Sequence, residues 1–587
     1  MKRKKLPIGI SDFKDVVSGD YYYVDKTLFI QEIMDRGSKI LLIPRPRRFG
    51  KTLNLSMVGY FYDCCPEKIS TEVDGLFPTH KNALPKNSYG QLFQRFNIAR
   101  AGQEYMAKMG KHPVIFFSFR SIKETTWKNC LEKIKQLIVD AYLTHDYLLH
   151  SPLLKTEEKN YFHRIIEWQG SSVDYGNSLE KLLHFLSRYY EERVVILIDE
   201  YDAPIHAGFA HHYYDDIIHF IRNFLGGGLK DTDKYLEKSV ITGILRIAKE
   251  SIFSGLNNPG VFTLTSNQFN DQFGFTEAEV ETMLTDFDLL HRYDEIKKWY
   301  NGYMFGDKTI YNPWSIINFL EDIDHNILPY WVNTSNNELI ESLLSNGGKE
   351  LKEELEQLLQ GESIEKIIDE NIVMKEISSR EDLLWSFLLM GGYLKYTAKR
   401  MDLSIGKYYY VLSIPNLEVR ITYIDIINHY FSAKVKTTKL ESMLKALIEG
   451  NVVLFEEILQ DVVAVVFSYH DFGGEPERVY HALVAGLLVW ISGTHEIKSN
   501  RESGYGRYDI MIIPKDPQLV GYVIEFKGVN KRKKETVKNA TAVALKQIED
   551  KQYETELRER GIDTIKKLAI VFSGKNVFVT ESSNTIK

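Results

Sequence analysis

The triplet Gly50-Lys51-Thr52 follows an apolar run at 40–43 and opens a segment, 52–62, in which apolar residues recur at helical spacing. A buried strand, a tight loop and a helix in this order favour phosphate binding, because the first N–H groups of a helix have no intrahelical partner and carry partial positive charge. Lys51 would reach the β- and γ-phosphates of a nucleotide, and the Thr52 hydroxyl would hold Mg²⁺. The spacing therefore predicts a site for ATP and Mg²⁺.

The loop before this triplet departs from the full phosphate-loop pattern G-x-x-x-x-G-K-[ST], because Arg45 stands where the pattern has its first glycine. A basic surface turn that happens to contain Gly-Lys-Thr is the alternative interpretation. The apolar strand before the loop and the acidic pair described next favour a phosphate-binding loop. The residues expected to surround the nucleotide are Arg45, Pro46, Arg47, Arg48, Phe49, Gly50, Lys51 and Thr52.

Two adjacent carboxylates, Asp199 and Glu200, follow five consecutive aliphatic residues at 194–198. Such a run predicts a strand buried on both faces, as in a parallel sheet. Asp199 would hold Mg²⁺ through water, and Glu200 would polarise the water that attacks the γ-phosphate. A core strand that runs into an acidic turn is the alternative. Together with the Gly-Lys-Thr loop, the pair predicts an ATPase.

Two residues further along the chain are candidates for sensing the γ-phosphate. Thr242 ends a short strand at 238–242, and in this type of sheet the strand after the acidic one is expected to carry a polar sensor. Arg246 is the nearest cation that could serve as an arginine finger or sensor. A salt bridge on a helix face explains Arg246 about as well.

A third group of charged residues lies near the carboxyl terminus. Asp509 stands in a predicted strand at 506–513, and Glu525 and Lys527 stand in the next one at 520–527. The two-residue period of a strand places Glu525 and Lys527 on one face, and a hairpin through 514–517 would bring Asp509 beside Glu525. The two carboxylates would bind Mg²⁺, while Lys527 would position or deprotonate a water and stabilise the transition state. Charged alternation on a half-buried strand is the alternative.

Two predicted helices flank these strands. Glu477 lies on a helix at 477–488, one turn from His481, and is a further candidate metal ligand. Gln547 lies on a helix at 539–553 and would complete the site. A helix, an Asp strand, a Glu-x-Lys strand and a Gln helix in this order are the pattern of a PD-(D/E)XK nuclease. Such folds can also keep the pattern for binding alone.

The bulk composition bounds the class of protein. A chain of 587 residues is too long for one core, and a formal net charge of −7 excludes a generally basic nucleic-acid coat, so a polyanion would be met by local patches such as 45–48 or 531–534. Three cysteines form no disulfide framework, which suits a reducing cytoplasm. No signal-peptide core follows the basic start, and the longest apolar run, 483–491, is too short for a membrane span. We expect a soluble cytoplasmic protein without a membrane partner, and a homo-oligomer is compatible with the sequence.

The predicted elements give the following organisation. The fold class is α/β, a P-loop NTPase parallel sheet with a helical lid and connector, followed by an α+β PD-(D/E)XK (restriction-endonuclease-like) domain. A capping box at 276–279 opens the predicted lid, and Asp25 is expected to cap an earlier helix. The expected domains are an AAA-like ATPase domain at 1–275, a lid at 276–345, a connector at 346–435 and a nuclease-like domain at 436–587.

Several of these motifs together give a resemblance along nearly the whole chain. The sequence resembles the bacterial AAA-ATPase-like family, whose members join a P-loop ATPase to a C-terminal PD-(D/E)XK nuclease-superfamily domain. Arg45 is not a departure within that family, whose loop reads much like Arg-Pro-Arg-Arg-Phe-Gly-Lys. The resemblance implies ATP binding, Mg²⁺ and action on nucleic acid. The segments that carry it are 23–27, 44–52, 197–202, 242–246, 299–303 and 525–527.

Two hypotheses of different classes follow. In the first, the protein is an ATP-dependent, metal-requiring nuclease in which the nucleotide state controls the C-terminal site. In the second, it is a nucleotide-switched binding or signalling protein whose C-terminal domain only docks nucleic acid or a protein partner. The presence of Asp509, Glu525 and Lys527 together favours the enzyme, because a binding module has no chemical need for all three.

Overall fold

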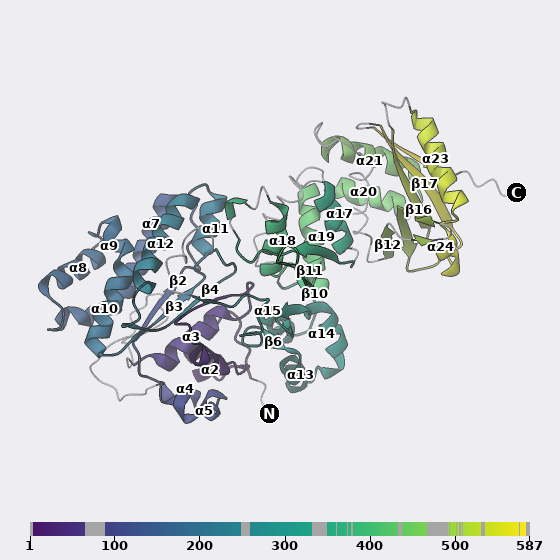
Figure 1. Ribbon diagram of the computed structural model, residues 1–587. Coiled ribbons are helices and arrows are strands. Elements are labelled where there is room, and N and C mark those ends of the chain that lie inside the picture. Colours follow the sequence, from purple (N-terminus) through teal and green to yellow (C-terminus); the bar gives the residue numbers. More distant parts are fainter. Residues whose placement is uncertain are drawn as a thin grey trace. The chain divides into compact units, whose positions relative to one another are not determined.

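The computed structural model divides the chain into two compact units (Figure 1). The first comprises residues 1–334 and 365–418, and the second comprises residues 335–364 and 419–587. The structure describes residues 4–64, 89–247, 259–331, 349–359, 361–372, 374–376, 380–432, 437–466, 491, 494–499, 502–503, 506–507, 509–529, 535–573 and 576–582.

The first unit contains a five-stranded sheet in the order β2-β3-β4-β1-β5, and every neighbouring pair of strands is parallel. Every residue of β1 and β3 is buried, as expected for aliphatic runs covered on both faces. This confirms the predicted parallel sheet. The strands are β1 (Ile40–Pro44), β2 (Val114–Ser118), β3 (Val194–Asp199), β4 (Leu236–Gly243) and β5 (Gly260–Val261).

Helices cover this sheet, and in the view of Figure 1 helices α2 and α3 lie below the strands while α7 and α12 lie above them. The apolar residues of α7 and α12 recur at helical spacing, so that each presents one buried side, whereas α3 is buried along nearly its whole length. The longer helices are α2 (Leu28–Asp35), α3 (Lys51–Tyr62), α7 (Trp127–Leu143), α8 (Thr156–Ile166), α10 (Ser178–Tyr190), α11 (Ala203–Ala210) and α12 (Tyr214–Leu229). The short ones are α1 (Phe13–Ser18), α4 (Gly90–Phe93), α5 (Ile98–Ala101), α6 (Gln103–Met106) and α9 (Ser172–Gly176).

The segment after the sheet begins with the predicted capping box, in which Thr276 and Glu279 each accept a hydrogen bond from the other's backbone N–H. Its helices pack with a three-stranded sheet in the order β6-β8-β7. The conspicuous aromatics of this region serve packing, since Tyr300, Tyr303 and Tyr311 are buried. The elements are β6 (Phe275–Thr276), α13 (Glu277–Asp286), α14 (Tyr293–Tyr300), β7 (Tyr303–Phe305), β8 (Lys308–Tyr311) and α15 (Pro313–Glu321).

The expected helical connector is wrong in part, because residues 395–413 form an antiparallel hairpin. The hairpin carries a run of three tyrosines and a valine at 408–411, residue types that fit a pleated strand better than a helix, and Gly406 turns the chain with a φ of 64°. With β9 it makes a sheet in the order β10-β11-β9. The elements are β9 (Ile364–Ile367), α18 (Glu381–Met390), β10 (Lys395–Asp402), β11 (Lys407–Ser413) and α19 (Leu417–Ser432).

The second unit is built on a mixed five-stranded sheet in the order β12-β15-β16-β17-β18. Strands β16 and β17 are parallel, and the other neighbours are antiparallel. The strands are β12 (His495–Ser499), β15 (Ile510–Pro514), β16 (Gly521–Gly528), β17 (Ile565–Ser573) and β18 (Asn576–Glu581), with a small ladder of β13 (Glu502–Ser503) and β14 (Gly506–Arg507). The helices are α17 (Lys349–Leu359), α20 (Thr437–Ile448), α21 (Val452–Val466), α23 (Val537–Asp550) and α24 (Thr555–Glu559).

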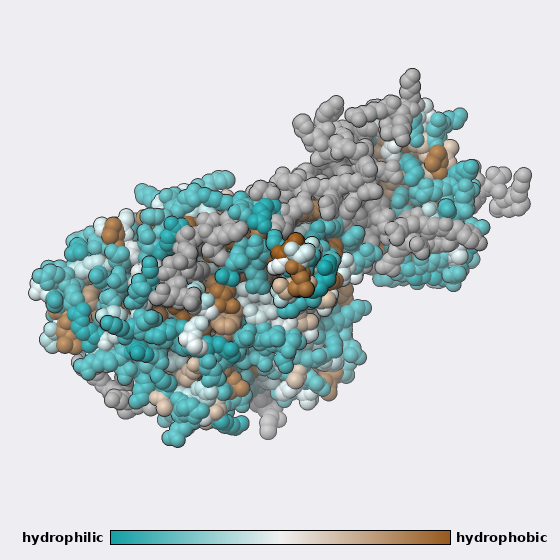
Figure 2. Space-filling view, in the orientation of Figure 1, coloured by the Kyte–Doolittle hydropathy of each residue, from teal (hydrophilic) through white to brown (hydrophobic). Residues whose placement is uncertain are grey.

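A helix that spans a membrane must be about 20 residues long and largely apolar. Within the described ranges, no helix combines the length and the apolar character that crossing a membrane requires. The face shown in Figure 2 is mostly hydrophilic, with small separate hydrophobic patches.

Candidate functional site

The phosphate-loop sequence forms a strand, a tight loop and a helix, as predicted. The loop between β1 and α3 contains two left-handed residues, Arg48 with a φ of 68° and Gly50 with a φ of 81°. Glycine accepts this conformation readily, whereas an arginine there stores local strain, which is common at functional sites. Lys51 is buried, and its Nζ donates hydrogen bonds to the carbonyl oxygens of Arg45 at 3.0 Å and Pro46 at 2.9 Å. Burial lowers the Lys51 pKa, although the carboxylate of Glu200 opposes the shift.

Asp199, at the end of β3, is linked to helix α3 and to strand β4 through its two carboxylate oxygens. The Thr52 hydroxyl donates to Oδ2 at 2.7 Å, and the Thr242 hydroxyl donates to Oδ1 at 2.8 Å. Burial raises the Asp199 pKa, and the neighbouring charge of Glu200 raises it further. The structure thus brings together Thr52 of α3, Asp199 of β3 and Thr242 of β4, which the sequence proposed for one site.

A cavity of about 290 Å³ opens beside this group. Glu200 lines it and has a φ of 48°, a left-handed conformation that is strained for a glutamate. The lining of the cavity combines a largely cationic polar set with an apolar set. The polar set includes Arg47, Arg48, Gly50, Lys51, Thr52, Arg120, Lys123 and Glu200, and the apolar set includes Leu6, Pro7, Ile10, Val24, Phe275, Met283, Pro313, Trp314 and Ile317.

Arg120 and Lys123 were missed by the sequence reasoning. They follow β2, and β2 lies next to β3 with Ser118 paired to Asp199. Because ligands bind outside the carboxyl ends of parallel strands, polar residues just after any buried strand of such a sheet are candidates. The apolar run at 113–119 was the signal that could have pointed to them.

Arg45 does not take the predicted place beside a nucleotide. Its side chain is fully buried, and its guanidinium donates to the carbonyl oxygens of Pro44 at 2.8 Å, Phe262 at 2.8 Å and Phe269 at 2.9 Å. Its backbone N–H donates to the carbonyl oxygen of Gly243 at 2.9 Å. Burial lowers the Arg45 pKa to about 9. Arg45 therefore anchors the loop to Gly243, Phe262 and Phe269. These contacts explain how the loop forms without the first glycine of the pattern.

Pro46 and Arg246 also lie away from the cavity lining. Pro46 packs against Gly392, where an added Cβ would come within 3.0 Å of the Pro46 Cβ. Arg246 lies just beyond β4, and its carbonyl oxygen accepts a hydrogen bond from the Ile372 N–H at 3.2 Å. The contacts of Arg246 thus give no support to its expected role as an arginine finger, whereas Phe49, Gly50 and the other loop residues do line the cavity.

The two residues after Glu200 position the segment that follows β4. The Asp202 Oδ2 accepts hydrogen bonds from the N–H groups of Ile244 at 2.8 Å and Leu245 at 2.9 Å. The Tyr201 hydroxyl donates to the Leu245 carbonyl oxygen at 2.8 Å and accepts from the Ile247 N–H at 3.0 Å. Burial raises the pKa of Asp202, but the hydrogen bond from His206 and those from the backbone outweigh it and leave the pKa lowered. Tyr201 and Asp202 therefore hold residues 244–247, the segment after β4, in place.

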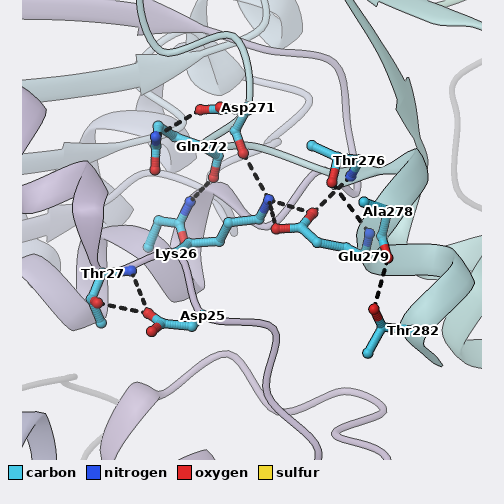
Figure 3. A network of polar contacts seen from close by, with 10 residues as sticks. Asp25, Lys26, Thr27, Asp271, Gln272, Thr276, Ala278, Glu279 and Thr282 are labelled. Atoms are coloured by element: carbon cyan, nitrogen blue, oxygen red, sulfur yellow. Dashed lines mark hydrogen bonds and ion pairs between the residues drawn. The ribbon is translucent and has the colours of Figure 1, made fainter. Parts of the chain in front are cut away.

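Lys26, which lines the cavity, is part of a network of polar contacts (Figure 3). The Nζ of Lys26 donates to the Glu279 carboxylate at 2.7 Å and to the Asp271 carbonyl oxygen at 2.7 Å. Glu279 also accepts from the Thr276 N–H at 2.7 Å, so Lys26 is tied to the start of α13. Asp25 does not cap α2 in the expected way, because its Oδ1 accepts from the N–H of Thr27, the residue before the helix, at 2.9 Å.

The predicted nuclease residues also come together, in the second unit. Strands β15 and β16 pair with Ile510 opposite Ile524, which places Asp509 opposite Glu525. The Asp509 Oδ2 accepts a hydrogen bond from the Phe526 N–H at 2.7 Å, and the Lys527 Nζ donates to the Glu525 Oε1 at 3.0 Å. Glu525 is buried, whereas the Lys527 side chain is 22% exposed. One carboxylate is thus withdrawn from water and paired with a cation that solvent can reach.

The same face of the sheet packs against α23. Met511 and Val523 belong to a core cluster with Ile548 and Tyr553, and the two-residue period places Asp509, Glu525 and Lys527 on that face. The Gln547 Nε2 donates to the Tyr553 hydroxyl at 3.3 Å. Burial raises the Tyr553 pKa, and the charges of Glu525 and Asp509 raise it further. Gln547 therefore lies on the helix that packs against this face, and its part in the site stays a prediction. Tyr553, which the sequence gave no motif to identify, is its hydrogen-bond partner.

The donor atoms of both sites suit a hard divalent cation. Thr52 with Asp199, and Asp509 with Glu525, offer hydroxyl and carboxylate oxygens, and Mg²⁺ is commonly bound by one or two carboxylates with water. Among the residues that the structure describes, no group of three or more His, Cys, Asp or Glu side chains is placed to hold a metal ion. The further candidate ligand Glu477 lies outside the described residues.

The parallel sheet, with Lys51 and Thr52 at the start of α3 and Thr52 bonded to Asp199 at the end of β3, is a P-loop-like fold in the first unit, and the second unit carries a mixed sheet with Asp509 opposite Glu525. Residues 7–253 match the family described as "Predicted AAA-ATPase", and residues 475–582 match the PD-(D/E)XK nuclease superfamily. The two matches confirm the resemblance, in that the N-terminal region is similar to the AAA-ATPase-like family and the C-terminal region to the PD-(D/E)XK nuclease superfamily.

A relative matches along almost the whole chain. It is an uncharacterised protein in the vnfD 5' region of Azotobacter chroococcum mcd 1, 25% identical over 579 residues, which are 98% of this chain and 97% of the relative. No solved structure matches the chain.

Proposed function

We propose that this protein binds and hydrolyses ATP with Mg²⁺ at the first site and cleaves nucleic acid phosphodiesters at the second. In this proposal the nucleotide state controls access to, or activity at, the nuclease site. The observation that carries it is the hydrogen-bonded chain from Thr52 through Asp199 to Thr242, beside Lys51 and at the rim of a cavity of ligand size.

At the ATPase site, Lys51 would contact the β- and γ-phosphates, and the apolar set of the cavity lining would take the base. Glu200 would accept a hydrogen bond from the attacking water. The water oxygen forms a bond to the γ-phosphorus as the bond to the β,γ-bridging oxygen breaks, the electron pair stays on ADP, and the water proton passes through Glu200 to solvent. Mg²⁺ held by Thr52 and Asp199 would neutralise phosphate charge.

At the nuclease site, Lys527 would orient the attacking water and stabilise charge that develops on the scissile phosphate. The water oxygen bonds to phosphorus as the bond to one ester oxygen breaks, the proton of the attacking water passes to solvent, and the leaving oxygen takes up a proton from solvent. Asp509 and Glu525 would hold Mg²⁺, whose charge would lower the barrier to attack on the phosphodiester anion. Gln547 of α23 would hold the hydroxyl of Tyr553, which follows that helix and feels the charges of the two carboxylates.

The proposal is tested by incubating the protein with a panel of DNA and RNA, with and without ATP and with Mg²⁺ or Mn²⁺. We expect cleavage by the wild type and loss of cleavage in Lys527→Ala. ATP binding should be lost in Lys51→Ala and retained in Lys527→Ala. Equal cleavage by the wild type and by an Asp509→Ala/Glu525→Ala double variant would remove the nuclease assignment, and ATP binding that survives in Lys51→Ala would remove the nucleotide site.

A second candidate function is nucleotide-switched binding of nucleic acid or a protein partner without cleavage. The ion pair between Lys527 and Glu525 favours it, because a lysine held by the metal-binding carboxylate is less available to water. ATP binding without turnover, and no degradation of any nucleic acid in the panel, would support this function over the first.

A further inference from the structure

The loop after β2 emerges beside the acidic end of β3. Ser118 of β2 pairs with Asp199 of β3, and the Phe119 N–H donates to the Asp199 carbonyl oxygen at 2.9 Å. This bond anchors the start of the loop at the level of Asp199 and Glu200. Residues 120–123 therefore begin next to the candidate water-polarising carboxylate.

Two cations of this loop, Arg120 and Lys123, line the cavity together with Glu200. Both belong to the exposed class of residues, so a ligand in the cavity can reach them. They also interact with the cations of the phosphate loop. Partial desolvation lowers the Arg48 pKa, and the charge of Arg120 lowers it further. Partial desolvation by neighbouring atoms also lowers the pKa of the exposed Lys123, and the charge of Arg47 adds to that shift.

Among the described residues that line the cavity, Glu200 is the one carboxylate beside these mutually repelling cations. Positive charges held near one another in partly desolvated positions are stabilised by an anion between them. The electrostatics of the cavity therefore fit a ligand with several negative charges, such as the triphosphate part of a nucleotide.

The strand order indicates which part of the triphosphate the two cations would meet. In the order β2-β3-β4-β1-β5, the phosphate loop leaves β1, while β2 lies beyond β3 on the far side. A triphosphate held by Lys51 and extending toward Asp199 and Glu200 presents its last phosphate to the end of β3. The loop after β2 is next to that end, and apolar residues of the same lining would take the base.

We propose that Arg120 and Lys123 supply, from within the same chain, the positive charge that stabilises the γ-phosphoryl group during its transfer to water. They would contact the γ-phosphate oxygens, which share the negative charge as the bond to the bridging oxygen breaks. This gives them the role for which Arg246 was the candidate from the sequence. The inference rests on the proposed ATP hydrolysis and adds that no arginine finger from a second copy is required.

The first test compares ATP turnover and ATP affinity in Arg120→Ala, Lys123→Ala and the double variant. Charge supplied in this way is worth about 10³-fold or more in turnover, so we expect the double variant to lose at least ~100-fold in kcat. ATP affinity should change less than ~10-fold, because Lys51 and the loop remain. The matched control is Lys128→Ala, an exposed lysine of α7 outside the cavity lining, which should leave both quantities unchanged.

The second test mixes the double variant with Lys51→Ala protein. If the cations act within one chain, the mixture should show no turnover. The double variant holds ATP but lacks the cations, and the Lys51→Ala protein has the cations but cannot hold ATP. Recovery of turnover in the mixture would show that the cations act on a neighbouring copy and would overturn the inference. Near-wild-type turnover in the double variant would also overturn it while leaving the proposed ATPase intact. A wild type that neither binds nor hydrolyses ATP would instead refute the proposed function itself.

Discussion

The two candidate sites bury their charges in different ways. In the ATPase unit Lys51, Asp199 and Asp202 are all buried, and each is held by two or more hydrogen bonds. In the nuclease-like unit Glu525 is buried, but its partner Lys527 is partly exposed and Asp509 is of intermediate exposure. A site for a small ligand can be preorganised inside loops at one edge of a sheet, whereas a site for a polymer needs an open face.

This difference bears on how each site is supported. The ATPase groups come from several strand ends, so their geometry depends on long-range contacts such as those of Arg45 with Phe262 and Phe269. The nuclease groups come from two adjacent strands and one helix, so the pairing register alone places them. We therefore expect substitutions in the first site to alter stability as well as chemistry, and substitutions in the second to alter mainly chemistry.

The largest expected effect is on nucleotide turnover in Lys51→Ala. Loss of the ammonium that contacts the β- and γ-phosphates should reduce ATP turnover by about 10³-fold. Basal cleavage of nucleic acid without ATP should be unchanged, and ATP should no longer alter it. Steady-state turnover and gel-based cleavage on one preparation measure both, with Lys128→Ala as the control. A change in basal cleavage without ATP would contradict the account, in which Lys51 affects the nuclease site only through bound ATP.

A second prediction concerns the ion pair between the buried Lys26 and the partly exposed Glu279. Lys26→Met leaves the Glu279 carboxylate, which is 26% exposed, without its cation, and should lower the free energy of unfolding by about 3 kcal/mol. The double variant Lys26→Met/Glu279→Gln should recover part of this loss, because no unpaired charge remains. Denaturant unfolding measures the cycle. Strictly additive losses would show that the pair is not coupled.

A third prediction concerns the buried carboxyl of Glu418, which accepts hydrogen bonds from the Ser315 hydroxyl at 2.8 Å and the Trp331 N–H at 2.8 Å. Burial raises its pKa from 4.5 to about 7. The folded protein then binds a proton that the unfolded chain releases, so stability falls as the pH rises from about 4.5 to about 7 and stays lower above it.

Glu418→Gln should remove this loss. At pH 8 its free energy of unfolding should exceed that of the wild type by up to about 3 kcal/mol, and the difference should vanish toward pH 4.5. Unfolding curves at several pH values provide the measurement. A variant whose stability follows the same pH dependence as the wild type would refute the assignment of that dependence to Glu418.

The smallest expected effect tests the helix side of the nuclease site. Gln547→Ala removes the donor to the Tyr553 hydroxyl and should slow cleavage about tenfold. The effect is small because the substitution disturbs a supporting contact and leaves the groups that touch the substrate unchanged. Tyr553→Phe should give a similar loss, and the two together should be less than additive. Lys546→Ala, an exposed neighbour on α23, serves as the control. Equal rates in all variants would place Gln547 outside the site.

Local sequence signals predicted the parts of each site that depend on short-range order. The aliphatic run of β3 and the Gly-Lys-Thr triplet identified the parallel sheet and placed Lys51, Thr52 and Asp199. The two-residue period predicted that Glu525 and Lys527 share a face. These features depend on residues near one another in the chain or on the fixed geometry of a strand.

What the sequence did not predict depends on contacts between distant segments. Arg45 looks like a phosphate ligand in its loop, but carbonyl groups more than 200 residues away enclose it. Arg120 and Lys123 became candidates only when β2 was found next to β3. For Arg45 and for the loop after β2, the partner that decides the outcome is remote in sequence. The hairpin at 395–413 is a local structure in which Tyr408, Tyr409 and Tyr410 lie opposite Met401, Arg400 and Lys399.

The central claim is that one chain carries a nucleotide site and a separate nucleic-acid-cleaving site, and Asp509→Asn tests it most directly. Cleavage of DNA and RNA and turnover of ATP should be measured on the same samples of wild type and variant with Mg²⁺. The account predicts that the variant loses cleavage and keeps ATP turnover. Cleavage at the wild-type rate by the Asp509→Asn protein would contradict it.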